Sequence, residues 1–250
     1  MASLILKIRT FVGLIQNTST WPTYYLDYLR SSHKDWIFKH KNLSIKVRAN
    51  SVDKWIAAEE FALDVYRIRK LDPAAFDQIF DIGAQIGTFC IHAAYIFPAA
   101  TVISLEPDFK NFGLLTENIA LNNLTNRITA INAAVSDNDG DSLNLYHGAD
   151  SAARSSYVQS EKFVTVKNFN FKKLKDMIKG RAFLKLDIEG GEISLFTSKY
   201  LELLKAFSYM VVEYHHFLPT HQKEPFEKFL VDNGFNFERD DLIYFIKPNL

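Results

Sequence analysis

Apolar residues repeat with two different periods along most of the chain, and these periods follow one another in a regular order. Continuous or alternating apolar runs, typical of strands, occupy residues 78–80, 101–106, 127–135, 182–188 and 209–215. Between and after them, apolar spacings of three and four residues predict helices at 88–97, 109–123, 171–179, 192–207 and 225–234. Strands that alternate with helices form right-handed crossovers and a parallel sheet. The pattern therefore predicts an α/β fold with a mostly parallel sheet.

Four strand-like segments fall outside this alternation. Residues 142–146 and 163–169 look like two added strands that interrupt it. Residues 235–240 and 242–247 close the chain and are separated by a single aspartate, which favours an antiparallel hairpin. We therefore expect the parallel sheet to end in an antiparallel hairpin.

The first part of the chain carries weaker signals. Residues 43–48 alternate like a short strand, and 52–70 have helical spacing with Ser51 as a plausible N-cap. No Pro, Gly or Ser linker long enough to separate independent domains follows. We expect an N-terminal helical extension with a short strand over 1–50 and one domain over 51–250.

The extension opens with an amphipathic helix. Lys7 and Arg9 interrupt its apolar residues, so it is too short and too charged to cross a membrane. We expect its apolar face to pack on the domain or on a second copy in a homodimer. A helix lying on a membrane surface is the less favoured alternative. The residues on the predicted face are Leu4, Ile5, Ile8, Phe11, Val12 and Ile15.

Composition narrows the classes of protein. The chain has 250 residues, 48% of them hydrophobic, which is enough for one sizeable core and excludes disorder. Lys plus Arg equals Asp plus Glu at 29 each, so no basic field favours nucleic acid as a partner. The single cysteine, Cys90, excludes an internal disulfide and a cysteine-based metal cluster, and it fits the reducing cytoplasm.

The turn after the first strand of the alternation carries the first chemical signal. Asp81 ends this strand, and Gly83 and Gly87 would let the backbone turn sharply and approach a ligand. The helix that follows offers free amide donors to a carboxylate or a phosphate. A dinucleotide fingerprint would place glycines where this chain has Gln85 and Thr88, so pyrophosphate binding is disfavoured.

The next strand ends in Glu106, 23 residues after Gly83, where an acidic side chain can accept hydrogen bonds from ribose hydroxyls. Asp81 could receive a cationic amino group. Together they indicate a ligand with an amino-acid end and a ribose end, and S-adenosylmethionine has both. A simpler interpretation is an ordinary tight turn followed by a solvated strand end. It would explain each of these residues taken alone, but their combination favours a nucleotide-containing cofactor.

Four stretches, FDIGAQIGTF, LEPDFKNFGLLTENIALNN, NAAVSDNDG and FLKLDIEGGE, resemble the successive motifs of the FkbM family of S-adenosylmethionine-dependent methyltransferases. The resemblance runs from about Trp55 to the C-terminus. It implies a Rossmann-like, seven-stranded class I methyltransferase fold with a reversed last strand. The family's best-supported activity is O-methylation, which implies a hydroxylated small molecule, a sugar or glycan, or a polyketide-like acceptor.

The resemblance also implies the residues that hold the cofactor. Asp81, Gly83, Ala84, Gln85 and Gly87 would cradle its methionine part. Glu106 would bind the ribose, and Ala134, after the third strand, would border the adenine. The family usually has asparagine where this chain has Gln85, so the amide reaches one methylene further and its contact is expected to shift.

Methyl transfer to a hydroxyl also needs a group that removes a proton. Asp187 ends the apolar strand 182–188, so we predict a catalytic role for it. The next strand ends near Glu213, His215 and His216, and the first two are our other catalytic candidates. Glu192 fits better as an acid that stabilises the first turn of a helix.

Three other interpretations remain open. Asp187, Glu189 and Glu213 could hold a divalent metal, but their spacing matches no compact signature, so metal-free base catalysis is favoured. An RNA methyltransferase is less favoured because the strand ends in LDIEG, not in the Asn-Pro-Pro-Tyr type of tetrapeptide, and the net charge is zero. A module that kept the fold but lost its activity is the third interpretation, with Gln85 as its sign.

Overall fold

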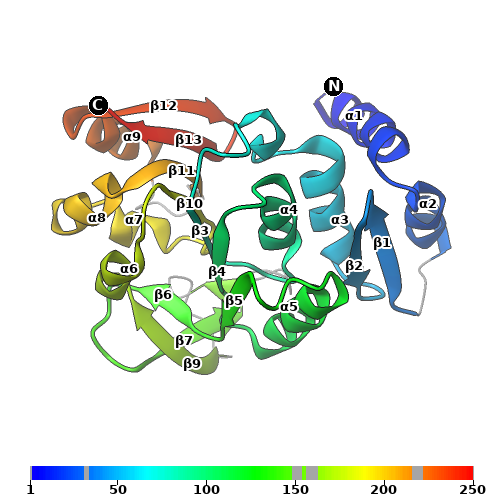
Figure 1. The fold of residues 1–250 in the computed structure, drawn as a ribbon, viewed down its shortest axis with the longest axis horizontal. Coiled ribbons are helices and arrows are strands. Elements are labelled where there is room, and N and C mark those ends of the chain that lie inside the picture. Colours follow the sequence, from blue (N-terminus) through cyan, green and yellow to red (C-terminus); the bar gives the residue numbers. More distant parts are fainter. Residues whose placement is uncertain (1, 31–33, 148–153, 156–162, 216–221, 250) are drawn as a thin grey trace.

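A computed structural model describes residues 2–30, 34–147, 154–155, 163–215 and 222–249 of the chain (Figure 1). Its central sheet has seven strands in the order β12-β13-β11-β10-β3-β4-β5. Neighbouring strands pair in parallel except β13, which is antiparallel to both β11 and β12. The predicted α/β fold with a reversed last strand is therefore confirmed. The strands are β3 (Gln78–Ile82), β4 (Thr101–Leu105), β5 (Ile128–Ile131), β10 (Ala182–Leu186), β11 (Phe207–Glu213), β12 (Phe235–Asp240) and β13 (Ile243–Pro248).

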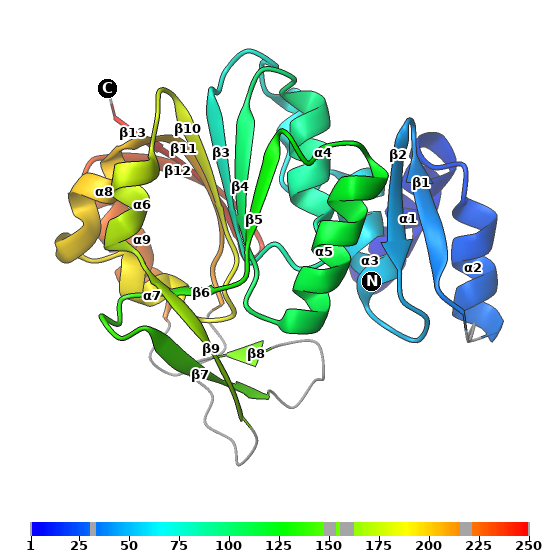
Figure 2. The same ribbon diagram turned by 60° about the horizontal axis from the view of Figure 1, so that its bottom comes forward.

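Helices cover both faces of this sheet, as Figure 2 shows. Successive strand residues point to opposite faces, so Phe183 joins the core under α4 while Leu184 joins the core under the later helices. One face carries α3 (Asp53–Ala58), α4 (Thr88–Ile96) and α5 (Phe109–Leu121). The other carries α6 (Lys172–Met177), α7 (Glu192–Leu195), the 3₁₀ turn η3 (Ser198–Tyr200), α8 (Leu201–Lys205) and α9 (Lys223–Asp232). The predicted helix 192–207 is thus three short pieces, because Thr197 is extended.

The predicted strand 127–135 is divided between two sheets. Its second half leaves the central sheet because Asn132 donates hydrogen bonds from its side chain to the carbonyls of Glu106 and Pro107 and turns the chain away. The second sheet has the order β6-β9-β7-β8 and contains both interrupting strands predicted from the sequence. Its members are β6 (Ala134–Ser136), β7 (Ser142–His147), β8 (Arg154–Ser155) and β9 (Phe163–Asn170).

The N-terminal extension adds a two-stranded sheet and two helices. The strand β2 (Leu43–Val47) was predicted, and it pairs with β1 (Trp36–His40), which was not. The predicted helix 52–70 is shorter than expected. Its α-helical turns, α3, pass into a π-helix, η1 (Glu59–Leu63), which ends where Asp64 adopts a left-handed conformation with φ 53°. A separate 3₁₀ turn, η2 (Ile68–Lys70), follows.

The first helix, α1 (Ala2–Asn17), docks through a different face from the one predicted. Leu14 is completely buried, and a Cβ atom at Gly13 would lie 2.6 Å from the carbonyl oxygen of Ala62. Phe11 and Ile15, by contrast, are each 44% exposed. Phe11 contacts only the next helix, edge-on at Trp21 and Tyr25, among the aromatic pairs of the described residues. The helix docks on the domain through Gly13 instead, because this small residue permits closer contact than the larger apolar residues. The alternative expectation, that the predicted face packs on a second copy, stays a prediction. The second helix is α2 (Trp21–Arg30).

A search of the helices in the described residues finds none whose length and apolar content would span a bilayer.

Candidate active site

A cavity of about 690 Å³ opens at the carboxyl ends of β3, β4 and β10, next to β6 and β7. Ligands of open α/β sheets bind at this edge. Of the predicted site residues, those that line the cavity are Gly83, Gln85, Glu106, Ala134 and Asp187. The other predicted residues lie behind its wall and are Asp81, Ala84, Gly87, Glu213 and His215.

The two glycines of the turn are required by packing within the protein. Gly83 has φ 84°, and a Cβ atom on it would lie 1.7 Å from the backbone oxygen of Asp187. Gly87 has φ 91° at the N-cap of α4, and a Cβ atom there would lie 2.6 Å from Leu115. Only Gly83 reaches the cavity. Gly83 therefore brings the ends of β3 and β10 together, Gly87 lets α4 begin close to α5, and any contact with a ligand is additional.

Gln85 occupies a conformation that favours asparagine or glycine. Its φ is 51°, in the left-handed region where asparagine is enriched among non-glycine residues. Its side-chain amide donates to Asp53 at 3.2 Å and its side-chain oxygen accepts from the amide of Ile86 at 2.7 Å. Arg48 in turn holds Asp53 with two hydrogen bonds of 2.8 Å from its guanidinium. The longer glutamine thus reaches the start of α3.

Glu106 is a buried carboxylate at the cavity wall. One oxygen accepts from the backbone amide of Gln85 at 2.8 Å, and the other accepts from the amide of Asp108 at 2.9 Å. Burial raises the pKa of Glu106 to about 7, although these hydrogen bonds oppose the rise. A carboxylate has room for about four hydrogen bonds, so Glu106 retains acceptor capacity toward the cavity.

Asp81 turns away from the cavity toward the layer of α4. In the sheet it pairs in register with Lys185, whose ammonium lies 3.5 Å from it. The same ammonium donates to the carbonyl of Gly83 at 2.8 Å and to Asp187 at 3.3 Å. Desolvation raises the pKa of Asp81 to about 6, while Lys185 opposes the rise. The cation beside Asp81 is thus a residue of this chain, where the sequence suggested a ligand's amino group.

Lys185 is a site residue that sequence reasoning missed. It stands between Leu184 and Leu186 in a strand whose side chains are all buried. A lysine in such a run is rarely buried without a partner. That exception in the apolar pattern was the available signal, and it points to a carboxylate on a neighbouring strand.

His215 lies among four carboxylates. Its Nδ1 is 3.2 Å from Glu192, and its Nε2 is 3.6 Å from Glu189, 3.7 Å from Glu213 and 4.0 Å from Asp187. Burial alone would lower the pKa of His215, but the hydrogen bond to Glu192 and the nearby negative charges outweigh it and raise the pKa to about 10. The imidazole is therefore protonated at neutral pH. A protonated imidazole has no free nitrogen lone pair with which to accept a proton.

Two of these carboxylates, unlike His215, have a pKa near neutral pH. Desolvation and the charge of Asp187 raise the pKa of Glu189 to about 7. The charge of Asp187, followed by desolvation, raises the pKa of Glu213 to about 7 as well. Glu189 lines the cavity, whereas Glu213 accepts a hydrogen bond from the hydroxyl of Tyr66 at 3.3 Å behind the wall. Glu189 is thus the acid best placed to exchange a proton with a bound molecule.

Glu192 has a structural place in this cluster. It is completely buried, and its carboxylate accepts from the amides of Ile188 at 2.8 Å and Gly190 at 3.0 Å. These contacts fix the turn after β10, in agreement with the structural role expected of it. His216 lies outside the described residues.

Three non-glycine residues of the cavity wall have positive φ, namely Asn50 at 52°, Gln85 at 51° and Glu189 at 54°. Such conformations are unfavourable for residues with a Cβ atom and tend to cluster at functional sites. Gln85 and Glu189 turn the backbone just after the ends of β3 and β10, where Gly83 contacts Asp187. The strain coincides with the cavity that the sequence indicated.

Residues 81–237 match the family described as Methyltransferase FkbM domain. The chain belongs to this family. FkbM methyltransferases use S-adenosylmethionine as the methyl donor, so the cofactor of this chain is S-adenosylmethionine. No curated protein matches the chain significantly.

Several solved structures are similar to this FkbM methyltransferase. One is a precorrin-6y C5,15-methyltransferase from Geobacter metallireducens, at 14% identity over 78% of this chain and 87% of that one, with a TM-score of 0.44. Another is TYW2 of P. horikoshii in complex with MeSAdo, at 14% identity over 86% and 70%, with a TM-score of 0.42. A third is the N-terminal domain of human METTL16 in complex with SAH, at 13% identity over 82% and 74%, with a TM-score of 0.41.

Proposed function

We propose that this FkbM methyltransferase is an O-methyltransferase that acts on a hydroxyl of a small molecule, a sugar or glycan, or a polyketide-like compound. The observation that carries the proposal is the pairing of Asp187 with Glu189 on the cavity wall, where Glu189 has a pKa of about 7. A base with a pKa near the working pH is the most effective at removing a proton from a hydroxyl.

The cavity wall suits the methyl donor. Glu106 is buried and keeps acceptor capacity, so it would bind the ribose hydroxyls. Gly83 and Gln85 would hold the methionine part, and Ala134 would border the adenine, as the family resemblance implies. When bound, S-adenosylmethionine supplies a methyl group activated by a sulfonium. The negative charges of the acids around the cavity would stabilise the positive charge of the sulfonium.

The remaining predicted residues would act through their neighbours. Asp81 holds Lys185, which in turn holds the carbonyl of Gly83. Ala84 donates its amide to the carbonyl of Leu105 at 3.0 Å and fixes the turn. Gly87 lets α4 begin close to α5. These residues are positioning residues for the methionine site.

We assign the removal of the proton to Glu189. In its ionised form it would accept the proton of the acceptor hydroxyl, while Asp187 orients that hydroxyl. Protonated His215 lies behind them and lowers the pKa of Glu189 through its charge, and Glu213 lies 3.7 Å from His215. Both are therefore positioning residues in this proposal, in place of the direct catalytic role expected from the sequence.

The cleft also offers ligand atoms for a metal. Atoms of Asp187, Glu189 and His215 lie within 4.8 Å of one another. The proton on His215 competes with a metal for the imidazole, because only the neutral ring coordinates. Metal-free base catalysis therefore remains our proposal.

An RNA acceptor is less well supported. The cavity wall includes Glu106, Asp108, Asp187 and Glu189, and clustered negative charge repels a phosphate backbone. A module without activity would leave no reason for an acid tuned to a pKa of about 7 at the cavity wall.

A methyl-transfer screen tests the proposal. The protein is incubated with tritiated S-adenosylmethionine and with hydroxylated metabolites, sugars, glycans and RNA, with and without a chelator. We expect label in a hydroxylated compound, identified as an O-methyl group by NMR, and the same rate with chelator. Label in RNA or on nitrogen would contradict the proposal, and cofactor binding without any transfer would favour the inactive module.

The exposed face of α1 supports a further expectation, that two copies of the chain associate through this helix. It presents Ile8, Phe11, Val12 and Ile15 to solvent. Light scattering should give the mass of a dimer for the wild type and of a monomer for the double variant Phe11→Ser and Ile15→Ser. A monomeric wild type would contradict it. A reducing compartment stays a prediction that rests on the single, buried Cys90.

A further inference from the structure

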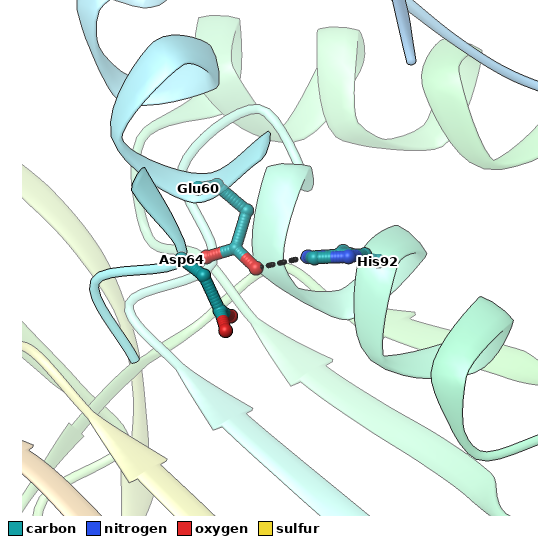
Figure 3. Close-up of side chains that lie close together, drawn as sticks. All are labelled: Glu60, Asp64 and His92. Atoms are coloured by element: carbon teal, nitrogen blue, oxygen red, sulfur yellow. Dashed lines mark hydrogen bonds and ion pairs between the residues drawn. The ribbon is translucent and has the colours of Figure 1, made fainter. Parts of the chain in front are cut away.

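A second cluster of ionisable side chains lies outside the cavity, between the π-helical turn η1 and α4 on the face of the sheet that α4 covers. Glu60 and Asp64 come from the π-helical turn η1 and its end, and His92 comes from the middle of α4 (Figure 3). Their side chains are almost completely enclosed, with 2% of Glu60, 7% of Asp64 and none of His92 exposed. Each residue offers a ligand atom, and the three atoms lie within 4.8 Å of one another.

Two buried atoms of this cluster have no hydrogen-bond partner. Glu60 uses one carboxylate oxygen to contact Nδ1 of His92 at 2.5 Å, but its other oxygen has none. Nε2 of His92 also has none. Figure 3 shows the Glu60 carboxylate between the imidazole and the Asp64 side chain. A buried carboxylate oxygen without a partner is strongly unfavourable, so a ligand that satisfies it would stabilise the fold.

The backbone around the cluster is irregular. The chain passes from α3 into a π-helix at Glu59–Leu63, and Asp64 then has a φ of 53°. Single π-helical turns occur frequently at functional sites. The irregular turn places both acids on the side of α4 that carries His92. Glu60 and Asp64 precede residues 81–237, which match the methyltransferase family, so this arrangement is a feature of the chain outside the family's matched region.

We propose that Glu60, Asp64 and His92 bind a divalent transition metal of the zinc type. One imidazole nitrogen with carboxylate oxygens is a donor set that zinc accepts, and three protein ligands leave a fourth position for water. Zinc bonds of about 2.0–2.1 Å would separate neighbouring ligand atoms by about 3.3 Å. Binding thus opens the Glu60 to His92 contact slightly and draws the Asp64 carboxylate inward.

The surrounding charges are compatible with a dication. Arg69 lies 3.3 Å from Asp64 and offsets part of its charge, while one carboxylate oxygen of Glu60 has no hydrogen-bond partner. The ring of His40 lies edge-on to that of His92, with the ring centroids 5.4 Å apart, and burial lowers the pKa of His40 to about 4, so it adds no positive charge at neutral pH. A metal bound there would tie η1 to α4 beneath the N-terminal extension.

Metal content and thermal unfolding test the proposal directly. The full chain is saturated with zinc, dialysed against metal-free buffer and analysed by mass spectrometry for metals. We expect about one zinc per chain. The unfolding temperature should rise by about 5–10 °C when free zinc is roughly 100 times the Kd, and a chelator should reverse the rise.

Matched variants locate the metal. His92→Gln and His215→Gln each remove the imidazole from one of the two clusters that could hold a metal. We expect His92→Gln to lose the zinc and the thermal shift, and His215→Gln to keep both. Asp64→Asn, which leaves the contact between Glu60 and His92 intact, should weaken zinc binding at least tenfold. It serves as the second variant if His92→Gln does not fold.

Two outcomes would overturn the proposal. The first is a zinc-saturated wild type that retains no metal after dialysis and unfolds at the same temperature with and without zinc. The second is a metal lost in His215→Gln and retained in His92→Gln and Asp64→Asn, which would place it in the cleft. The first outcome leaves the proposed methyl transfer unchanged. A metal in the cleft would contradict metal-free base catalysis but not methyl transfer itself, which the screen for methylated products tests separately.

Discussion

Two clusters in this molecule contain nearly the same groups in different surroundings. In the cleft, His215 lies beside Asp187 and Glu189, whose side chains are 24% and 35% exposed. Between η1 and α4, His92 lies beside Glu60, and these side chains are 0% and 2% exposed. Asp81 is influenced by both clusters, because the charge of Asp187 in the first and the charge of Glu60 in the second both raise its pKa. The chemistry available to each cluster therefore depends on access to solvent.

Access decides whether a proton can leave. In the cleft, a carboxylate with a pKa of about 7 can exchange protons with a bound molecule or with water. Between η1 and α4, groups that are sealed from water can only pair with each other or with an enclosed cation. The same residue types therefore serve proton transfer in the cleft and structural stability between η1 and α4. The following predictions test this division.

The largest expected effect is on turnover. Glu189→Gln removes the proposed base and should lower kcat by about two to four powers of ten, with little change in cofactor affinity. Glu60→Gln is the matched control, and its folded fraction should turn over at the wild-type rate. Steady-state kinetics with the acceptor found in the screen provide the measurement. A Glu189→Gln enzyme as fast as the wild type would remove this residue from the mechanism.

The next effect is on stability and has the reverse pattern. Glu60→Gln breaks a buried charged pair with His92, so the free energy of unfolding should fall by about 3–5 kcal/mol. Glu189→Gln alters a partly exposed side chain and should change it by about 1 kcal/mol or less. Urea unfolding of the two variants and the wild type measures the difference. Equal losses would mean that the clusters do not differ in the way described.

A smaller effect concerns the pH dependence of kcat. The charge of Asp187 raises the pKa of Glu189, and the charge of His215 lowers it. Asp187→Asn should therefore shift the rising limb of the profile, expected near the Glu189 pKa of about 7, to lower pH. His215→Gln should shift it to higher pH. Shifts in the same direction, or an unmoved limb in both variants, would show that another group titrates.

The smallest effect is on the pH dependence of folding. The folded pKa of Glu213 is about 7, above its ordinary value of 4.5. Its contribution to stability is therefore present below about pH 4.5 and is lost as the pH rises through about 7. Glu213→Gln should be up to about 1 kcal/mol more stable than the wild type near pH 8 and lose this advantage near pH 5. Denaturant unfolding at both pH values measures it, and an equal difference at both would contradict the pKa shift.

Much of the fold and the edge of the cleft could be predicted from local pattern. Alternating apolar periods gave the strands and helices, and the carboxyl ends of parallel strands indicated where Glu106 and Asp187 meet the cavity. Such inferences succeed because burial acts on each segment separately and because all parallel strands end at one edge. The topology of the sheet therefore fixes where the residues at the ends of its strands lie.

Contacts made across elements could not be predicted in the same way. Asp81 and Lys185 pair through sheet register, and Glu60 meets His92 only because the π-helical turn η1 packs on α4. The docked face of α1 depends on the close approach that Gly13 allows to Ala62. Each depends on how distant segments pack, which a single sequence without an alignment does not reveal. The charge on His215 was missed for the same reason, since four carboxylates from two segments surround it.

Calorimetric titration with S-adenosylmethionine tests the central claim most directly, because it needs no knowledge of the acceptor. The wild type should bind one molecule per chain. Glu106→Gln keeps the size of the side chain and removes the charged acceptor, so its affinity should fall by about 1–3 kcal/mol, which is roughly 5- to 150-fold. A wild type that does not bind S-adenosylmethionine, or a variant that binds it as tightly as the wild type, would contradict the assignment of the cavity.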